Sequence, residues 1–497
     1  MQQKFLALFR HLFTRRNGMR ILFAIAFLAA LWAAFCIEER WRGRRVWQRY
    51  SESARERGVP LDVAAVLRPK VPDTENFAAI PMIQNLFTAA EAHEPLPVWF
   101  EALKMDSADD RRPNFHGTQA PSLTAWRDHF VREGVIPSAG PDPAADVLAA
   151  IEKVRPELDE LRETGRRPHS KFPVKWELGF AAYLPHLQPL IKATNVYQLS
   201  ATAHLARGES AAACDDLRDA LRIYTALDRE PALICGLVRL GIVEKVAARV
   251  RDGIAEGRWD APELEKLQAL FTGIHITDDW RYALNSERAV VNSATMELHE
   301  RSDRSLAQVA SELTGNSVSR GSISTTAVTL YPRGWLWLSQ RKVNEFFDRS
   351  IDRVDAIAAG KPFVLPSDAA ADVEKIATAG RLARLPYLLY VMFTPALGNV
   401  ENKYLHCLST VAQTQLACSL DRHRLAKGAY PEQLGALMPE FIPALPHDPI
   451  TQTSMLYRKT PAGGFELWSV GLNRTNDSAA ELPGKDPKDQ PDWVWRR

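Results

Sequence analysis

The chain has 497 residues, of which 46% are hydrophobic and 25% charged, values that predict a folded globular body rather than a disordered chain. At roughly 150 residues per domain, this length predicts two to four domains. Lysine and arginine total 62 against 60 aspartates and glutamates, which excludes a nucleic-acid-binding surface spread over the whole protein. The five scattered cysteines are too few to predict a disulfide framework.

The N-terminus combines a basic amphipathic segment with an uncharged apolar run. In residues 1–18, apolar residues at helical spacing alternate with basic ones, and no acidic residue occurs, so we expect this segment to lie on an anionic membrane surface. From Ile21 to Ile37 the 17 residues carry no charge, which corresponds to about 25 Å of helix. This run predicts a transmembrane anchor over residues 19–38, with the lipid bilayer as its partner.

A buried core helix and a secretory signal peptide are the two alternatives for this segment. The basic flanks and N-terminal position favour an anchor over a core helix. No small-x-small cleavage site ends the apolar run, and a bulky Phe35 precedes Cys36, which argues against both signal cleavage and lipidation. We therefore predict an uncleaved single-pass anchor. Because basic residues flank it on both sides, the charge distribution does not decide its orientation in the membrane.

Residues 39–144 are predicted to form a linker helix followed by a loop-rich region. The polar helical pattern continues from Arg40 to Gly58 and then breaks at prolines. Between Asp106 and Pro143 only Leu123 to Val135 has a helical pattern, so we expect a long surface excursion there.

Residues 145–400 are predicted to form a helical domain. Apolar stripes at three- and four-residue spacing predict helices over 145–161, 183–207, 210–227 and 231–250, and a further helix from Trp335 to about Gly360. The segment from Leu199 to Leu227 resembles one tetratricopeptide-type helix pair, but no second copy follows at the expected period, so we expect irregular helical hairpins. The apolar stretch from Leu385 to Leu397 is too short to span a bilayer, and we expect it to be buried.

Residues 401–497 are predicted to form a small α+β module. A helix ends at Lys427–Gly428, and two strand patterns, around Tyr457 and over 465–470, are joined by a Gly/Pro hairpin signal at 460–464. The order of these parts, with Gly-x-Tyr-Pro, Leu-Pro-x-Asp-Pro and Phe-x-Leu-Trp-Ser-Val-Gly, resembles the C-terminal region of G-type type II secretion pseudopilins. Similar ends occur in uncharacterised bacterial membrane proteins. The pseudopilin cleavage site is not matched at Gly18–Met19–Arg20, so we do not expect polymerisation.

The resemblance also implies a calcium site, because the loop after the last glycine binds calcium in those pseudopilins. The corresponding loop here offers hard oxygen donors at Asn473, Asp477, Asp486 and Asp489, with Asp492 after them. The spacing does not match an EF-hand, and Lys485 and Lys488 lie beside these donors. An ordinary solvated polar loop is therefore the alternative.

No contiguous catalytic motif occurs in the chain: HExxH, GxSxG and GxxxxGK[ST] are absent. Asp109–Asp110 and Asp215–Asp216 are adjacent pairs that we predict to be solvated, since neighbouring residues on a helix point about 100° apart. The prediction is a mainly α protein with an N-terminal transmembrane helix, a helical-hairpin body and a small α+β C-terminal module.

As for function, we expect a non-enzymatic interaction or scaffold component that binds a protein partner. Its expected place is the bacterial inner membrane, with a periplasmic body near a secretion or pilus-like system. The alternative is a membrane-tethered hydrolase whose active-site residues are distant in the sequence.

Overall fold

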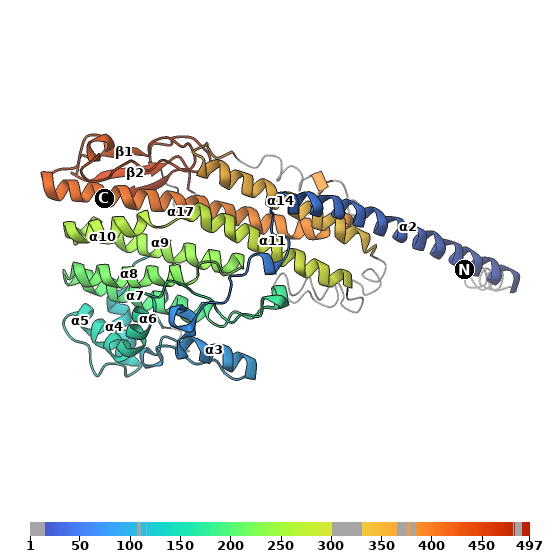
Figure 1. Ribbon diagram of the computed structural model, residues 1–497. Helices are drawn as coiled ribbons and strands as arrows, with labels where there is room; N and C mark the ends of the chain where they lie inside the picture. Colours follow the sequence, from blue (N-terminus) through green and yellow to red (C-terminus); the bar gives the residue numbers. More distant parts are fainter. Residues whose placement is uncertain are drawn as a thin grey trace, which may run out of the picture. The chain divides into compact units, whose positions relative to one another are not determined.

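The computed structural model describes residues 15–106, 111–115, 117–300, 331–364, 375–376, 378, 384–480, 482 and 490–497, and these are mainly helical (Figure 1). The helices are α2 (Arg15–Glu56), α3 (Pro81–Ala92), α4 (Leu123–Arg132), α5 (Pro143–Ile151), α6 (Arg155–Thr164), α7 (Leu187–Ala206), α8 (Ser210–Ala226), α9 (Leu233–Glu256), α10 (Ala261–Thr272), α11 (Ile276–Glu300), α14 (Gly334–Ala358) and α17 (Leu388–Lys427). Short 3-10 helices lie at Val63–Ala65, Asp73–Glu75, Phe77–Ala79, Glu101–Leu103, Glu152–Val154, Trp176–Ala181, Leu385–Tyr387 and Leu434–Leu437. The strands are β1 (Leu456–Lys459), β2 (Phe465–Ser469) and β3 (Trp493–Arg496). The predicted fold class is confirmed.

The chain divides into two compact units, each assembled from separate segments. Unit 1 comprises residues 1–61, 291–346 and 367–395, and unit 2 comprises residues 62–290, 347–366 and 396–497. Residues 1–14 of the predicted amphipathic segment 1–18 lie outside the described residues.

In unit 1, helix α2 is long and apolar enough to span a membrane, and the apolar window within it has no buried residue. Large apolar side chains between Ile21 and Ile37 are exposed around the helix; Leu22 and Phe23, for example, are 66% and 71% exposed. A core helix of a soluble protein buries such side chains. The predicted membrane-spanning length and composition are therefore confirmed.

Further along, helix α2 packs closely against α14 within unit 1. A Cβ atom at Gly43 would collide with the carbonyl oxygen of Gly334, and one at Gly334 would collide with the backbone at Glu39, so both glycines permit the close crossing. The indole Nε1 of Trp335 donates to Glu39 Oε2 at 2.9 Å, and Trp47 stacks on Trp337. This polar part of α2 is thus fixed to the unit by both backbone packing and side-chain contacts.

In unit 2, helices α7, α8 and α9 all contact one another, and Figure 1 shows them lying side by side. Helix α9 has buried residues on most of its circumference because neighbours cover several of its faces.

The predicted helix over 145–161 is instead α5 and α6, separated by a 3-10 turn at Glu152–Val154. Pro156, in the first turn of α6, lacks the N–H that a continuous helix would need.

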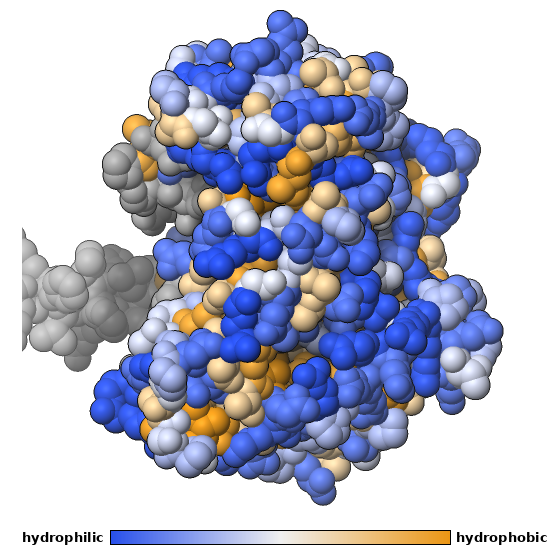
Figure 2. Space-filling model, turned by 90° about the vertical axis from the view of Figure 1, so that its left-hand side faces the viewer, coloured by the Kyte–Doolittle hydropathy of each residue, from blue (hydrophilic) through white to orange (hydrophobic). Residues whose placement is uncertain are grey.

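The C-terminal sheet has the strand order β1-β2-β3 and is antiparallel throughout. The predicted hairpin is confirmed, with Tyr457 opposite Leu467. Strand β3 was not predicted; it pairs with β2, and Trp495 lies opposite Leu467. The sheet contacts the C-terminal half of α17 through Gln413, which donates to the Trp493 carbonyl at 2.6 Å, and Tyr430, in the segment after α17, packs on Phe465. Figure 2 shows a mainly hydrophilic face on which hydrophobic residues gather in small patches.

Candidate functional site

The loop predicted to bind calcium is described only in part. Asn473 donates from Nδ2 to Asp477 Oδ2 at 2.6 Å, and Asp492 is fully buried and accepts from the Ala479 amide at 2.8 Å. Asp486 and Asp489 lie outside the described residues. Within the described part of the chain, no group of three or more His, Cys, Asp or Glu side chains could hold a metal ion. Calcium binding therefore stays a prediction.

The pair Asp215–Asp216 separates into one exposed and one buried carboxylate. Asp215 is half-exposed and pairs with Arg218, as expected of a solvated residue. Asp216 is buried, which makes the prediction of a solvated side chain wrong for it. On α8 this side chain points toward α7 and α6, where His204 and Arg162 lie 3.8 and 3.9 Å from its oxygens. Burial raises the pKa of the Asp216 carboxyl to about 6.

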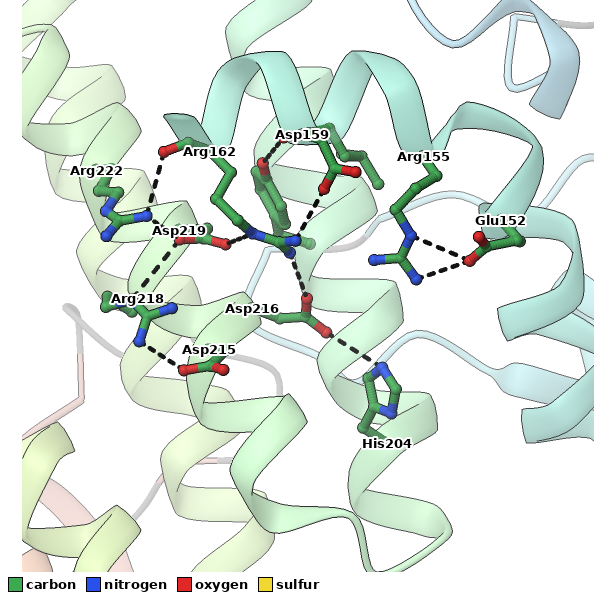
Figure 3. Close-up of polar contacts among 12 residues, drawn as sticks. Glu152, Arg155, Asp159, Arg162, His204, Asp215, Asp216, Arg218, Asp219 and Arg222 are labelled. Atoms are coloured by element: carbon green, nitrogen blue, oxygen red, sulfur yellow. Dashed lines mark hydrogen bonds and ion pairs between the residues drawn. The ribbon is translucent and has the colours of Figure 1, made fainter. Parts of the chain in front are cut away.

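Arg162 is the centre of this ionic network, which Figure 3 shows joining three helices. From α6 it donates to Asp219 on α8 at 2.5 Å and to Asp159 on its own helix at 3.0 Å. Asp219 also accepts from Arg222 at 2.6 Å. These charges pair with one another and line none of the larger cavities, so we interpret the network as a structural connection between α6, α7 and α8.

Three cavities in the described part of unit 2 are large enough for a ligand and contain polar groups; the third, about 490 Å³, lies beside Arg249 and Asp252, which pair with each other. The first, about 680 Å³, is bounded by loops around Trp99 and Arg112 and by α7. Its most prominent cation, Lys192, already donates to Asp106 at 2.5 Å and to the Trp99 carbonyl at 2.6 Å. The second, about 560 Å³, retains polar groups that are not engaged, and we therefore take it as the candidate functional site.

This second cavity, called the His406 pocket here, lies between α9, α17 and β3, with Gly117 and Thr118 at one wall. Its polar lining comes from two helical stripes and the end of the chain: Glu244 and Arg251 on α9; Lys403, His406, Thr410 and Gln413 on α17; and Gln490 and Asp492. Residues three, four or seven apart share one face of a helix, so each stripe points into the pocket. Trp493 and Trp495 form an apolar wall and are each only 2% exposed.

His406 and Glu244 form a pair within the pocket. The Nδ1 atom of His406 lies 2.9 Å from Glu244 Oε1, and the Trp493 ring meets the imidazole edge-on at 5.3 Å. When Nδ1 donates to the carboxylate, Nε2 of the neutral ring is left as an acceptor. Among the described residues Nε2 has no hydrogen-bond partner. The ring is therefore oriented by the protein and has one nitrogen available to a bound molecule.

Sequence inspection missed this site, because its two stripes are separated by about 160 residues and no contiguous motif joins them. One signal was present: Lys403, His406, Thr410 and Gln413 repeat at three- and four-residue spacing, which puts them on one face of the helix. A polar stripe of this kind is also typical of a solvated helix face. Only the packing of α9 and β3 beside it makes the stripe the lining of a pocket.

Comparison with known proteins gives no match to a protein-family model, a curated protein or a solved structure. The residues of the His406 pocket and the apolar helix α2 are therefore the features that bear on function.

Proposed function

We propose that the chain is a single-pass membrane protein that holds a partner-binding helical body at the bilayer. The exposed apolar run Ile21–Ile37 supports the tether, since its length suits a hydrocarbon core. Placement in a bacterial inner membrane with a periplasmic body follows from the resemblance of residues 401–497 to type II secretion pseudopilins. That resemblance also suggests a scaffold role near a secretion or pilus-like system.

The observation that supports partner binding is the composition of the His406 pocket. It combines an apolar tryptophan wall with polar groups that are not satisfied within the described protein, namely His406 Nε2, Lys403 and Arg251. Binding sites commonly have this composition, with a few polar groups that fix orientation on an apolar surface. We infer that a protein partner inserts a segment here.

Gly241 permits a direct test of partner binding. It lines the pocket, and a Cβ built on it has no atom within 4 Å, so a larger side chain would enter open space. We expect Gly241→Phe to fill the pocket and abolish capture of the partner from cross-linked native membranes. Gly241→Ala, which adds only a methyl group, should capture the partner like the unaltered chain. Equal capture by the Phe variant, or no captured protein at all, would contradict the proposal.

A second candidate function, a hydrolase, is favoured by the His406–Glu244 pair alone. His406 Nε2 could take a proton from water while the resulting hydroxide attacks an ester carbonyl carbon. The carbon–oxygen bond to the leaving group then breaks, and Nε2–H returns the proton to the leaving alkoxide. Glu244 would orient the ring and stabilise its charged form, a role that carboxylates have in catalytic triads.

For the hydrolase candidate, we expect His406→Asn and Glu244→Gln to lower the hydrolysis of p-nitrophenyl acetate. The expected loss is about 100-fold for His406→Asn, because general-base catalysis contributes at least that factor. The matched control is His93→Asn, which changes an exposed histidine whose left-handed backbone asparagine tolerates. Activity that is absent from the unaltered chain, or unchanged in the His406 variant, would remove the hydrolase candidate.

A further inference from the structure

Two cations at the His406 pocket have no acidic partner in the described part of the chain. Lys403 is exposed and Arg251 is half-buried, and neither forms an ion pair with a described carboxylate. Each of the neighbouring acids has another contact: Glu244 contacts His406, Asp252 pairs with Arg249, and Asp492 accepts from the Ala479 amide through one of its two oxygens. In a chain with many arginine–carboxylate pairs, two cations left unpaired beside one cavity indicate where an acidic ligand would bind.

We propose that the His406 pocket binds an acidic peptide segment, whose carboxylates pair with Lys403 and Arg251. This inference rests on the proposed partner-binding function and names the chemistry of the partner. The cavity of about 560 Å³ is larger than a single carboxylate requires, so a side chain and adjoining backbone can enter it.

The walls of the pocket strengthen such pairing. The guanidinium of Arg251 lies over the Trp495 ring, 5.9 Å from its centre, which holds the cation beside the cavity. Trp493 and Trp495 exclude water from one side, and charges interact more strongly where water is excluded. A carboxylate bound to Arg251 would therefore gain more than it would from a cation on an open surface.

The charges that face the pocket also favour carboxylates over phosphates. Lys403, Arg251 and His406 are its basic groups, while Glu244 and Asp492 are acidic. Two nearby carboxylates would repel a phosphate dianion more than a singly charged carboxylate. The pocket thus suits a ligand whose negative charge is spread over separate side chains, as in a glutamate-rich peptide.

The test measures fluorescence anisotropy of a short labelled glutamate-rich peptide added to the full chain in detergent micelles. We expect saturable binding that weakens with added salt, and no binding of the same peptide with glutamine in place of glutamate. Lys403→Glu and Arg251→Glu should each weaken binding at least about tenfold, since each replaces an attraction with a repulsion. Lys153→Glu makes the same charge change at an exposed lysine that is not part of the pocket lining and should leave binding within about twofold.

Three outcomes would overturn the inference. The glutamate peptide could fail to bind, or the Lys403→Glu and Lys153→Glu variants could bind it equally well. The third outcome is that anionic lipid vesicles displace the labelled peptide at a lower concentration than unlabelled glutamate peptide does. Circular dichroism of each variant confirms that it is folded. If Gly241→Phe abolishes partner capture but the peptide does not bind, the partner-binding function stands and only its acidic chemistry is wrong.

Discussion

Arginine at positions 25 and 28 is expected to release the chain from membranes. Ile25 and Leu28 lie within the apolar run of α2 and are 58% and 64% exposed, so their replacement leaves protein packing intact. Exchanging a large apolar residue for arginine at the centre of a membrane helix costs about 3 to 4 kcal/mol per site. The double variant Ile25→Arg/Leu28→Arg should therefore move from the membrane pellet to the supernatant after alkaline carbonate extraction.

The matched control places arginine on the same helix beyond the apolar run. Ser53→Arg and Glu56→Arg alter exposed positions near the end of α2 and should leave the chain in the membrane pellet. Retention of the Ile25→Arg/Leu28→Arg variant in the pellet would show that something other than the apolar helix holds the protein at the bilayer.

The second large effect that we expect is a loss of folding stability at low pH, caused by His186. Its ring is fully buried, stacks on Phe172 at 4.1 Å and on Phe87 at 5.5 Å, and neither ring nitrogen has a hydrogen-bond partner in the described part of the chain. Burial lowers the pKa of His186 to about 3 from 6.5. The folded protein therefore holds a neutral ring at pH values where the unfolded chain binds a proton.

The sign of the pH dependence follows from these two pKa values. Stability from His186 is complete above pH 6.5 and is lost as the pH falls towards about 3, because the unfolded state then binds the extra proton. At pH 5 this one residue should lower the free energy of unfolding by about 2 kcal/mol relative to pH 7.5. Phenylalanine retains the aromatic stack without titrating, so His186→Phe should lose about 2 kcal/mol less over this range.

Urea unfolding of the full chain in micelles at both pH values measures this difference. His275→Phe makes the same substitution at an exposed histidine and should keep the acid sensitivity of the unaltered chain. Equal losses of stability for His186→Phe and the unaltered chain would show that His186 is hydrated or hydrogen-bonded in the folded protein.

Much of the helical architecture could be predicted from local patterns. The apolar run Ile21–Ile37, the helix ending at Lys427–Gly428 and the hairpin of β1 and β2 all depend on neighbouring residues, and each is present. Strand β3 was missed although Trp493 and Trp495 alternate with less buried residues. Four residues at the end of a chain give too short a pattern to predict a strand without its partner β2.

The candidate site could not be predicted in the same way. Glu244 and His406 belong to different helices, and the contact between them follows from how those helices pack. Asp216 illustrates the same limit, because its adjacency to Asp215 predicted a solvated pair, whereas α6 and α7 cover Asp216 and leave Asp215 exposed.

The sequence by itself determined the apolar helix, most helix positions and the C-terminal hairpin, since hydrophobic periodicity and turn residues act over a few residues. Only the tertiary structure decided which polar side chains are buried, paired or left unengaged. Burial depends on segments far apart in the chain, and it is burial that gives Asp216 and His186 their altered pKa values and makes His406, Lys403 and Arg251 the lining of a pocket.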